Sequence, residues 1–294
     1  MAPSHLAVAV LVMAIWGFNF VVIKFGIDSM PPLLLATLRF VVAALPAVFL
    51  PRPDVPWSRM IIIGMALFVG QFAFLFPALQ SGMPPGLASV VLQSQAFFTI
   101  IFAAAFIGER PKLRQLAGVI VAAAGLFVIA MTVGAGFTYA GLALTLAAAA
   151  SWATGNVMMR KAGKVDMLPM MVWLSLVPPL PLFAMSLYFE GWPAIHAAMT
   201  HFNAVGFAAV LYLAIPVTLF GFGIWGFLLK TYDAPTVAPF SLLVPLFGTV
   251  SAWLVLGESF STLRIAGMAL IVFGLAVVAL PLPRLLAGRL RGHS

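Results

Sequence analysis

The segment "ASVVLQSQAFFTIIFAAAFIGERPKLRQLAGVIVAAAGLFVIA", residues 88–130, decides the fold because it has a second copy in the chain. A shift of 149 residues places it on "VAPFSLLVPLFGTVSAWLVLGESFSTLRIAGMALIVFGLAVVA", residues 237–279. Apolar runs match by chance, but both copies also carry a Gly-Glu turn, at 108–109 and 257–258, followed by Ala-Gly at the same distance. We therefore expect two related halves.

The rest of the chain is similarly apolar. Of its 294 residues, 64% are hydrophobic and 7% are charged, whereas average soluble domains carry roughly 25% charged residues. This number of charged residues is too small to cover the surface of a soluble fold of this size. We therefore expect lipid to solvate most of the chain. The absence of cysteine excludes disulfides, thiolate chemistry and cysteine metal sites.

Ten apolar stretches are long enough to be membrane spans, since a helix needs about 20 residues to cross a hydrocarbon core of roughly 30 Å. The gaps between them are short turns that leave no room for a soluble domain. We therefore expect an all-α integral membrane protein that forms a single domain over residues 1–294, with repeat one at about 6–132 and repeat two at about 138–281. The first stretch is expected to be a span and not a cleaved signal peptide. The stretches lie roughly at 6–26, 32–50, 60–81, 85–107, 114–132, 138–159, 168–189, 204–229, 235–256 and 264–281.

The basic residues indicate the orientation. In a soluble protein the net charge of +8 would suggest a nucleic-acid partner. Here the basic residues lie between apolar runs, so the positive-inside rule explains them and no nucleic-acid partner is expected. With the N-terminus in the cytoplasm, twelve of the fifteen lysines and arginines fall in cytoplasmic segments, which places both termini there. These twelve are Arg52, Arg59, Arg110, Lys112, Arg114, Arg160, Lys161, Lys164, Lys230, Arg284, Arg289 and Arg291.

Five spans in each half mean that the second half enters the membrane from the opposite side. The charge distribution agrees, because Glu109 falls in a cytoplasmic turn and its counterpart Glu258 in an external one. Inverted repeats are the usual architecture of secondary transporters, with the substrate site near the midplane where the halves meet. The alternative is a duplication in a channel or a structural membrane protein.

Several short motifs resemble one known family. They are "WGFNFVVIKFG" at 16–26, "LRF" at 38–40, "GLASVVLQSQAFFT" at 86–99 and the paired "GER" and "GES" turns. In this order and spacing, over about residues 10–281, they resemble the EamA-type branch of the drug/metabolite transporter superfamily. Two longer pieces, "FVVIKFGIDSMPPLLLATLRF" and "VAPFSLLVPL", are most similar to bacterial exporters of cysteine-pathway metabolites and of aromatic amino acids. The resemblance implies an exporter in the bacterial inner (plasma) membrane, with a central cavity between the repeats.

Lys24 and Arg39 are charged residues within predicted spans. A charge at the centre of a span costs about 2.5–3.5 kcal/mol, so such residues usually face a cavity or a partner. Lys24 lies near the outer end of the first span, where it either anchors the helix by snorkelling or takes part in gating. Arg39 is either a buried cation bound by backbone carbonyls or by Asp28, or the partner of a substrate carboxylate, which arginine binds with a bidentate fork.

Tryptophan and asparagine occur together in the first and sixth spans. Trp16 and Asn19 are three residues apart and share a helix face, and Trp152 and Asn156 share a face by the same rule. Two such faces at matching places in the halves would line one cavity from both sides. The alternative is interhelical hydrogen bonding by asparagine with ordinary aromatic packing.

Other polar residues also lie in mid-membrane. Gln93 and Gln95 are two residues apart, so in a continuous helix they point to different faces and only one is expected to line a cavity. Pro239 and Pro245 are expected to kink the ninth span, which alternating-access helices tolerate. The remaining candidates for substrate binding, each with structural packing as its alternative, are Gln71, Tyr212 and Ser241.

The acidic residues and the histidines avoid the predicted spans. All seven acids lie in turns or at span ends, and the four histidines lie near the termini or in an external loop. Proton-coupled pumps usually carry a carboxylate or histidine relay within the membrane, so proton drive is not expected. An intramembrane enzyme would need a nucleophile with a base, paired carboxylates or a metal cluster. The spacing offers none of these, so we expect no catalytic residue, no metal and no cofactor.

Together these observations predict an exporter of neutral amino acids, both aromatic and small or aliphatic, that works by alternating access across a central cavity. Its expected partners are the amino-acid substrates and membrane lipid, with a monomer favoured. The alternatives are an exporter of another small metabolite or drug, or a channel.

Overall fold

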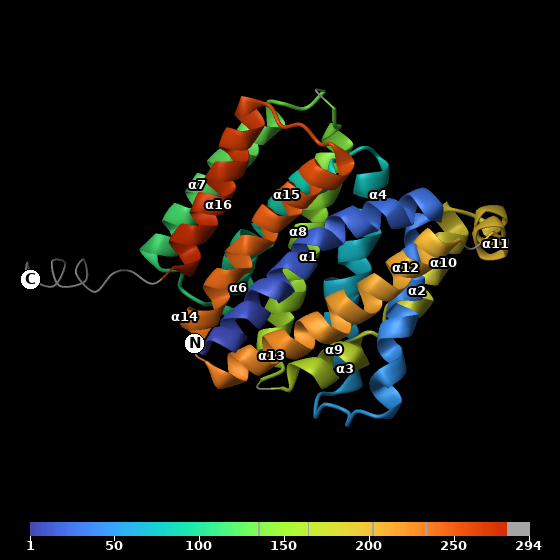
Figure 1. Cartoon of the computed structure of the whole chain (residues 1–294). Helices are drawn as coiled ribbons and strands as arrows, with labels where there is room; N and C mark the ends of the chain where they lie inside the picture. The colour runs from blue at the N-terminus through green and yellow to red at the C-terminus, as the bar shows by residue number, and fades with distance from the viewer. Residues whose placement is uncertain (135, 164, 202, 233, 281–294) are drawn as a thin grey trace, which may run out of the picture.

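The protein is all-helical in the residues that the structure, a computed structural model, describes: 1–134, 136–163, 165–201, 203–232 and 234–280. Nine helical segments within these ranges are long and apolar enough to cross a membrane (Figure 1). The stretch expected at 32–50 is a shorter apolar helix, Pro32–Val48. The chain is therefore a multi-pass membrane protein.

The described residues of the first half form seven α-helices and two helical segments of other types, η1 and η2. The helix α2 ends early because Pro46 has no N–H to bond the carbonyl of Val42, and the N–H of Leu45 bonds this carbonyl in a tighter turn instead. The elements are α1 (Pro3–Ser29), α2 (Pro32–Ala44), η1 (Leu45–Val48), α3 (Trp57–Gly64), the π-helical η2 (Met65–Gly70), α4 (Gln71–Gln80), α5 (Pro85–Val91), α6 (Ser94–Ile107) and α7 (Leu113–Ala130).

The second half repeats this plan and adds the short helix α11 after the C-terminal end of α10. Its elements are α8 (Tyr139–Lys161), α9 (Met167–Leu174), α10 (Pro179–Phe189), α11 (Trp192–Thr200), α12 (Ala204–Tyr212), the π-helical η3 (Leu213–Phe220), α13 (Gly221–Thr231), α14 (Ala234–Val237), the 3-10 helix η4 (Ala238–Leu242), α15 (Leu243–Leu256) and α16 (Thr262–Ala279).

The bounds of the helices recur at the spacing found in the sequence. Helices α6 and α15 begin and end 149 residues apart, as do α7 and α16. Gly108 and Gly257 end α6 and α15 in the same left-handed conformation, with φ of 69° and 67°, which glycine adopts without a steric penalty. The π-helical segments η2 and η3 also fall at matching places. The duplication therefore extends to the irregular parts of the helices.

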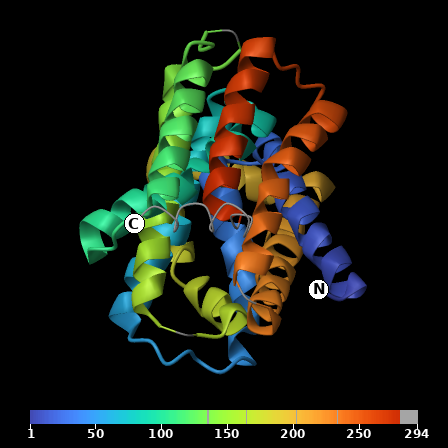
Figure 2. The same ribbon diagram turned by 90° about the vertical axis from the view of Figure 1, so that its left-hand side faces the viewer.

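Small residues bring several helices into close contact. Helices α7 and α16 lie side by side in both ribbon views (Figures 1 and 2). A Cβ atom added to Gly118 of α7 would lie 2.8 Å from the carbonyl oxygen of Gly274 in α16, and one added to Gly267 would lie 2.9 Å from that of Gly125. Because lipid tails give helices no hydrophobic reason to associate, close backbone packing of this kind supplies much of the attraction.

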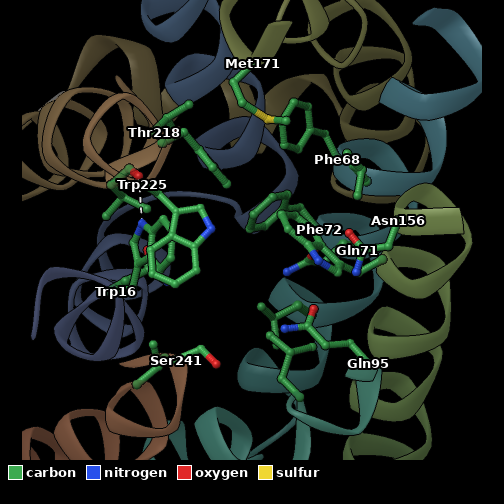
Figure 3. Close-up of a pocket in the computed structure, with 18 of the residues that line it drawn as sticks. Trp16, Phe68, Gln71, Phe72, Gln95, Asn156, Met171, Thr218, Trp225 and Ser241 are labelled. Atoms are coloured by element: carbon green, nitrogen blue, oxygen red, sulfur yellow. Dashed lines mark hydrogen bonds between the residues drawn. The ribbon is translucent and has the colours of Figure 1, made fainter. Parts of the chain in front are cut away.

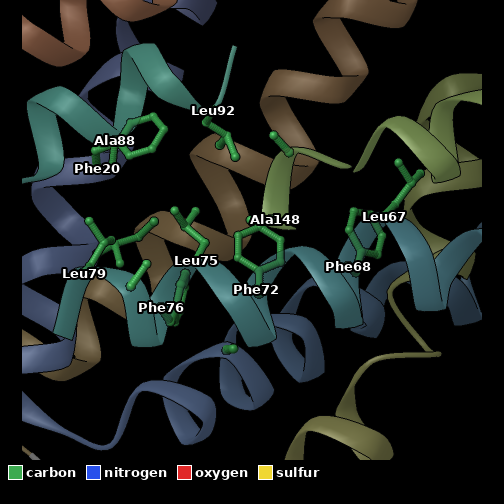
Figure 4. Close-up of a cluster of buried hydrophobic side chains, with 14 of the residues drawn as sticks. Phe20, Leu67, Phe68, Phe72, Leu75, Phe76, Leu79, Ala88, Leu92 and Ala148 are labelled. Atoms are coloured by element: carbon green, nitrogen blue, oxygen red, sulfur yellow. The ribbon is translucent and has the colours of Figure 1, made fainter. Parts of the chain in front are cut away.

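A cluster of phenylalanines from α2, η2 and α4 fills the core next to the central cavity (Figure 4). The ring of Phe40 lies 4.7 Å from that of Phe68 and 5.4 Å from that of Phe72, and Phe72 in turn contacts Phe76 at 5.3 Å. These side chains are buried, so the cluster holds one wall of the cavity in place.

Pro239 and Pro245, which the sequence predicted to kink the ninth span, lie at its irregular start, and the kink itself stays a prediction. Pro239 lies at the start of the 3-10 helix η4, and Pro245 lies in the first turn of α15. The N–H that proline lacks has no intrahelical partner in a first turn, so proline is tolerated there. The interruption of this span is therefore the 3-10 segment η4 itself.

Candidate functional site

A cavity of about 350 Å³ lies where the interrupted helices meet (Figure 3). Each interruption contributes to its wall: Phe68 from η2, Gln93 from the break between α5 and α6, Thr218 from η3 and Ser241 from η4. Irregular backbone redirects side chains and is concentrated at functional sites in helical proteins. Volumes in this range are typical of small-molecule sites.

Nine of the ten residues predicted to bind substrate line this cavity. The tryptophan and asparagine of α1 and those of α8 reach it from two sides, as their spacing had predicted. The nine residues are Trp16, Asn19, Arg39, Gln71, Gln93, Gln95, Trp152, Asn156 and Ser241. Their contact with a substrate remains a prediction.

Tyr212 is the exception, because it does not line the cavity. Its hydroxyl donates a hydrogen bond to the carbonyl of Ile15 at 3.1 Å, and its ring lies in a separate recess between α1 and α12. Tyr212 is the last residue of α12 and lies directly before the π-helical turn of η3. Its observed role is to connect α12 to α1.

Gln93 and Gln95 both line the cavity, so the expectation that only one would do so is wrong. That expectation assumed a continuous α-helix, but the helix is interrupted at 92–93. There the N–H of Gln95 bonds the carbonyl of Leu92 and the N–H of Ala96 bonds that of Gln93, both at 3.0 Å and three residues apart. The tighter winding changes the angle between the two glutamines.

Arg39 is the one charged residue among the described residues that line the cavity, and only 2% of it is exposed. Its Nη2 donates to the carbonyl of Leu213 at 3.2 Å and to Oγ1 of Thr218 at 3.0 Å. Its guanidinium carbon also lies 4.5 Å from the centre of the Phe72 ring, a cation–π distance. The wall of the cavity therefore carries one positive charge, held in a fixed position.

Lys24 lies outside the cavity wall. Its ammonium forms an ion pair with Asp28 one turn later in α1, with an Nζ–Oδ1 distance of 2.5 Å. Asp28 is thus the partner of Lys24 and not of Arg39, whose neighbours include the backbone carbonyl that the sequence allowed as the alternative. Anchoring and gating by Lys24 both stay predictions.

Aromatic side chains form the opposite wall. Trp16 donates from Nε1 to the carbonyl of Val217 at 3.0 Å, and its ring lies 5.3 Å from that of Phe222 and 5.7 Å from that of Trp225. Figure 3 shows Trp16 and Trp225 across the open space from Gln71. The cavity therefore has an aromatic side and a more polar side.

Several residues of the wall were not among the sequence candidates. They are mostly apolar, so nothing distinguishes them in a chain that is apolar throughout, and the hydroxyl of Thr218 stands out only through its contact with Arg39. These residues include Phe68, Phe72, Met159, Met167, Met171, Thr218 and Phe222.

The carboxylates of the described residues lie away from the cavity. Glu190 accepts from the N–H groups of Leu33 and Leu34 at 2.7 and 3.2 Å, at the start of α2. Glu258 accepts from the N–H of Gly86 at 3.1 Å, at the start of α5, and burial raises the pKa of its carboxyl. Both carboxylates therefore cap helix N-termini.

No metal site emerges from the described part of the chain, where His, Asp and Glu nowhere gather in a group of three that could hold an ion. Glu109, in the turn equivalent to that of Glu258, instead forms an ion pair with Arg160 at 2.6 Å. The groups available in the cavity are thus one guanidinium, several amides and hydroxyls, and aromatic rings. This set can bind a small amphipathic molecule but offers no general base.

Comparison with known proteins agrees with this picture. The model of the EamA-like transporter family matches residues 4–131 and again residues 139–280. The chain is 45% identical over 276 residues to a "Probable amino-acid metabolite efflux pump" of Salmonella typhimurium and 43% identical to a protein of the same name in Escherichia coli, each alignment covering 92% of both chains. A crystal structure with 22% sequence identity superposes with a TM-score of 0.65 over 99% of this chain and 100% of the other, which indicates the same fold.

Proposed function

Because the chain belongs to the EamA-like transporter family, whose relatives are named as transporters and not as enzymes, we propose that it exports neutral amino acids and related metabolites. The observation that carries this proposal is the cavity at the helix interruptions, with one fixed guanidinium facing an aromatic wall. The guanidinium suits a carboxylate, and the aromatic wall suits an apolar side chain. The names of the two most similar relatives described above favour the same substrate class.

The proposed mechanism is alternating access by two inverted repeats of five spans, with Pro32–Val48 as the tenth span. The contacts between helices support a symmetric arrangement of the two repeats. Helix α1 packs on α15 as α8 packs on α6, while α7 packs on α16 and α2 on α10. These are the pairings expected when a two-fold axis in the membrane plane relates the halves.

The proposed location is the bacterial inner membrane, with both termini in the cytoplasm. Eight of the twelve basic residues assigned to the cytoplasmic side lie in the described part of the chain; Lys164, Arg284, Arg289 and Arg291 fall outside it. Met159 of the cavity wall directly precedes Arg160 and Lys161, the basic residues in the last turn of α8, and Met167 of the wall is the first residue of α9. In the proposed orientation, this part of the cavity wall lies near the side from which an exporter loads its substrate.

Transport is proposed to run down the substrate gradient without proton coupling. No carboxylate or histidine is among the cavity-lining residues of the described chain, and proton relays are usually built from such groups. Export of another small metabolite or drug, and passage through a channel, remain the competing outcomes of the test.

The test is counterflow of radiolabelled amino acids in proteoliposomes, with and without a pH gradient. The panel includes threonine, methionine, cysteine, phenylalanine and tryptophan. We expect saturable exchange of several of these at rates that do not depend on the gradient, and protein-free liposomes are the control. Exchange of none of them would contradict the substrate class, and a non-saturable flux without counterflow would indicate a channel.

A further inference from the structure

Unpaired polar atoms are concentrated at the cavity. Six buried side-chain nitrogen and oxygen atoms have no hydrogen-bond partner among the described residues, and four of them belong to three residues of the cavity wall. These four atoms are Nε and Nη1 of Arg39, Oδ1 of Asn19 and Oε1 of Gln71. Buried polar groups are nearly always paired in native proteins, so such a concentration calls for a missing ligand.

Arg39 supplies the unpaired donors. Its Nη2 is occupied by Leu213 and Thr218, which fixes the guanidinium and leaves Nε and Nη1 for another acceptor. A carboxylate is the common biological acceptor that also carries the compensating charge. One carboxylate balances one guanidinium, and the described residues of the wall include no second cation for a dianion such as a phosphate monoester.

Asn19 and Gln71 supply the unpaired acceptors. Both are at least nine-tenths buried, with 9% and 6% of their surface exposed. They come from α1 and from the first position of α4, and Gln71 directly precedes Phe72, over whose ring the Arg39 guanidinium lies. An amide oxygen accepts hydrogen bonds from an ammonium group without the charge of a carboxylate.

We propose that Arg39, Asn19 and Gln71 form a head-group site for a zwitterionic α-amino acid. The substrate carboxylate accepts from Arg39, and the substrate ammonium donates to the amide oxygens of Asn19 and Gln71. The substrate side chain then lies toward Trp16 and Trp225, on the other side of the cavity in Figure 3. This assignment rests on the proposed function and names the part of the amino acid that is recognised.

The same arrangement explains a preference for neutral side chains. Arg39, the one charged residue among the described residues of the wall, is already paired with the substrate carboxylate. An acidic substrate side chain would add an unpaired negative charge to the site, and a basic side chain would add an unpaired positive charge. An unpaired charge in a desolvated site is costly. The site therefore selects against dicarboxylic and dibasic amino acids.

The experiment measures competition for binding to the purified, detergent-solubilised protein by scintillation proximity. The radioligand is the panel amino acid that exchanges fastest in counterflow, and the competitors lack either its amine or its carboxylate. For phenylalanine these competitors are 3-phenylpropionate and 2-phenylethylamine. We expect each to bind wild-type protein about tenfold to a hundredfold more weakly than the parent, the scale of hydrogen bonds to charged groups.

The variants assign each penalty to a residue. In Arg39→Gln, the competitor that lacks the carboxylate should bind at most about threefold more weakly than the parent amino acid. In the double variant Asn19→Leu/Gln71→Leu, the competitor that lacks the amine should likewise bind at most about threefold more weakly than the parent. Arg39→Lys keeps the charge without the planar fork and should fall between wild type and Arg39→Gln. Arg264→Gln is the matched control, because Arg264 is also buried and lies 4.9 Å from the ring of Phe137, but outside the cavity wall.

The outcomes separate this proposal from the proposed function. The head-group site would be overturned, while amino-acid transport stands, if wild type bound the parent amino acid and both competitors equally. It would also be overturned if the competitors still bound about tenfold to a hundredfold more weakly than the parent in folded Arg39→Gln and Asn19→Leu/Gln71→Leu. Loss of all binding in folded Arg39→Gln, with binding kept in Arg264→Gln, would support it. If no amino acid exchanges in counterflow, both proposals fail together.

Discussion

At the scale of single residues, the cavity separates groups that hold the fold from groups that are available to a ligand. Nη2 of Arg39 and Nε1 of Trp16 are each bonded to the π-helical segment η3, and so they stabilise the wall. The carbonyl oxygen of the Asn19 side chain is buried without a partner in the described chain. A substitution there removes no contact that the folded protein needs.

Asn19→Ala should therefore lower transport strongly while the melting temperature changes little. We expect at least about a tenfold loss of counterflow, on the scale of one hydrogen bond to a charged group. Asn203→Ala is the matched control, because Asn203 caps α12 by accepting from the N–H of Gly206 at 2.7 Å. It should cost about 1 kcal/mol of stability and leave transport intact. Intact transport in Asn19→Ala would remove Asn19 from the site.

Glu258 gives the protein a pH-dependent stability. Burial raises the pKa of its carboxyl, against the opposing effects of the Gly86 N–H and the Arg264 charge. The folded chain then binds more protons than the unfolded chain, so stability falls as the pH rises from the unfolded pKa, about 4.3, through the higher folded value. Glu258→Gln cannot titrate but still offers an oxygen to Gly86.

Melting temperatures in detergent between about pH 4 and pH 8 test this prediction. As the pH rises, the melting temperature of Glu258→Gln should fall less than the melting temperature of wild type. Glu109→Gln, in the equivalent turn of the first half, controls for the loss of a glutamate from such a turn. Parallel curves for wild type and Glu258→Gln would contradict the prediction.

At the scale of helices, the close contact between α7 and α16 depends on residues without side chains. A Cβ at Gly118 would lie 2.5 Å from Cγ2 of Val278 and 2.8 Å from the carbonyl oxygen of Gly274. Gly118→Val should therefore destabilise the protein by about 1–3 kcal/mol through overpacking. Ala117→Val, on the exposed side of α7, is the control and should be nearly neutral. Equal melting temperatures for the two variants would show that this contact does not stabilise the fold.

The sequence predicted the regular helices better than their interruptions. The shift of 149 residues matches the ends of α6 with those of α15, because the Gly-Glu turns mark them directly. The break at Gln93 and the π-helical turn of η2 contain no proline, so no such signal in the sequence indicates them. The turn of η3 contains Pro216, which has no N–H to bond the carbonyl of Tyr212. The break at 92–93 is why both Gln93 and Gln95 line the cavity, where a continuous helix would have allowed only one of them to do so.

Polarity in an apolar chain is a strong signal, and this explains the candidates that were placed correctly. Asn19, Gln71 and Arg39 stand out because lipid cannot satisfy them, so they must face a cavity or another helix. Phe72 and Met171 are as close to the cavity but look like any residue that faces lipid. Only the packing of the helices distinguishes these two roles.

At the scale of the whole molecule, the absence of cysteine makes the inverted topology directly testable. Arg110 and Ser259 occupy equivalent, exposed positions 149 residues apart. Arg110→Cys should react with a membrane-impermeant maleimide only after the cells are permeabilised, and Ser259→Cys should react in intact cells. Wild-type protein is the unlabelled control. Labelling of both cysteines from the same side would contradict the inversion.

The most direct test of the central claim, that neutral amino acids cross the membrane through this cavity, is counterflow by Ser241→Cys with and without a methanethiosulfonate reagent. Ser241 lines the cavity from η4. We predict that modification blocks saturable exchange of the panel amino acids, and that an excess of a transported amino acid slows the modification. Unchanged exchange after complete modification, or modification that no amino acid slows, would contradict the claim.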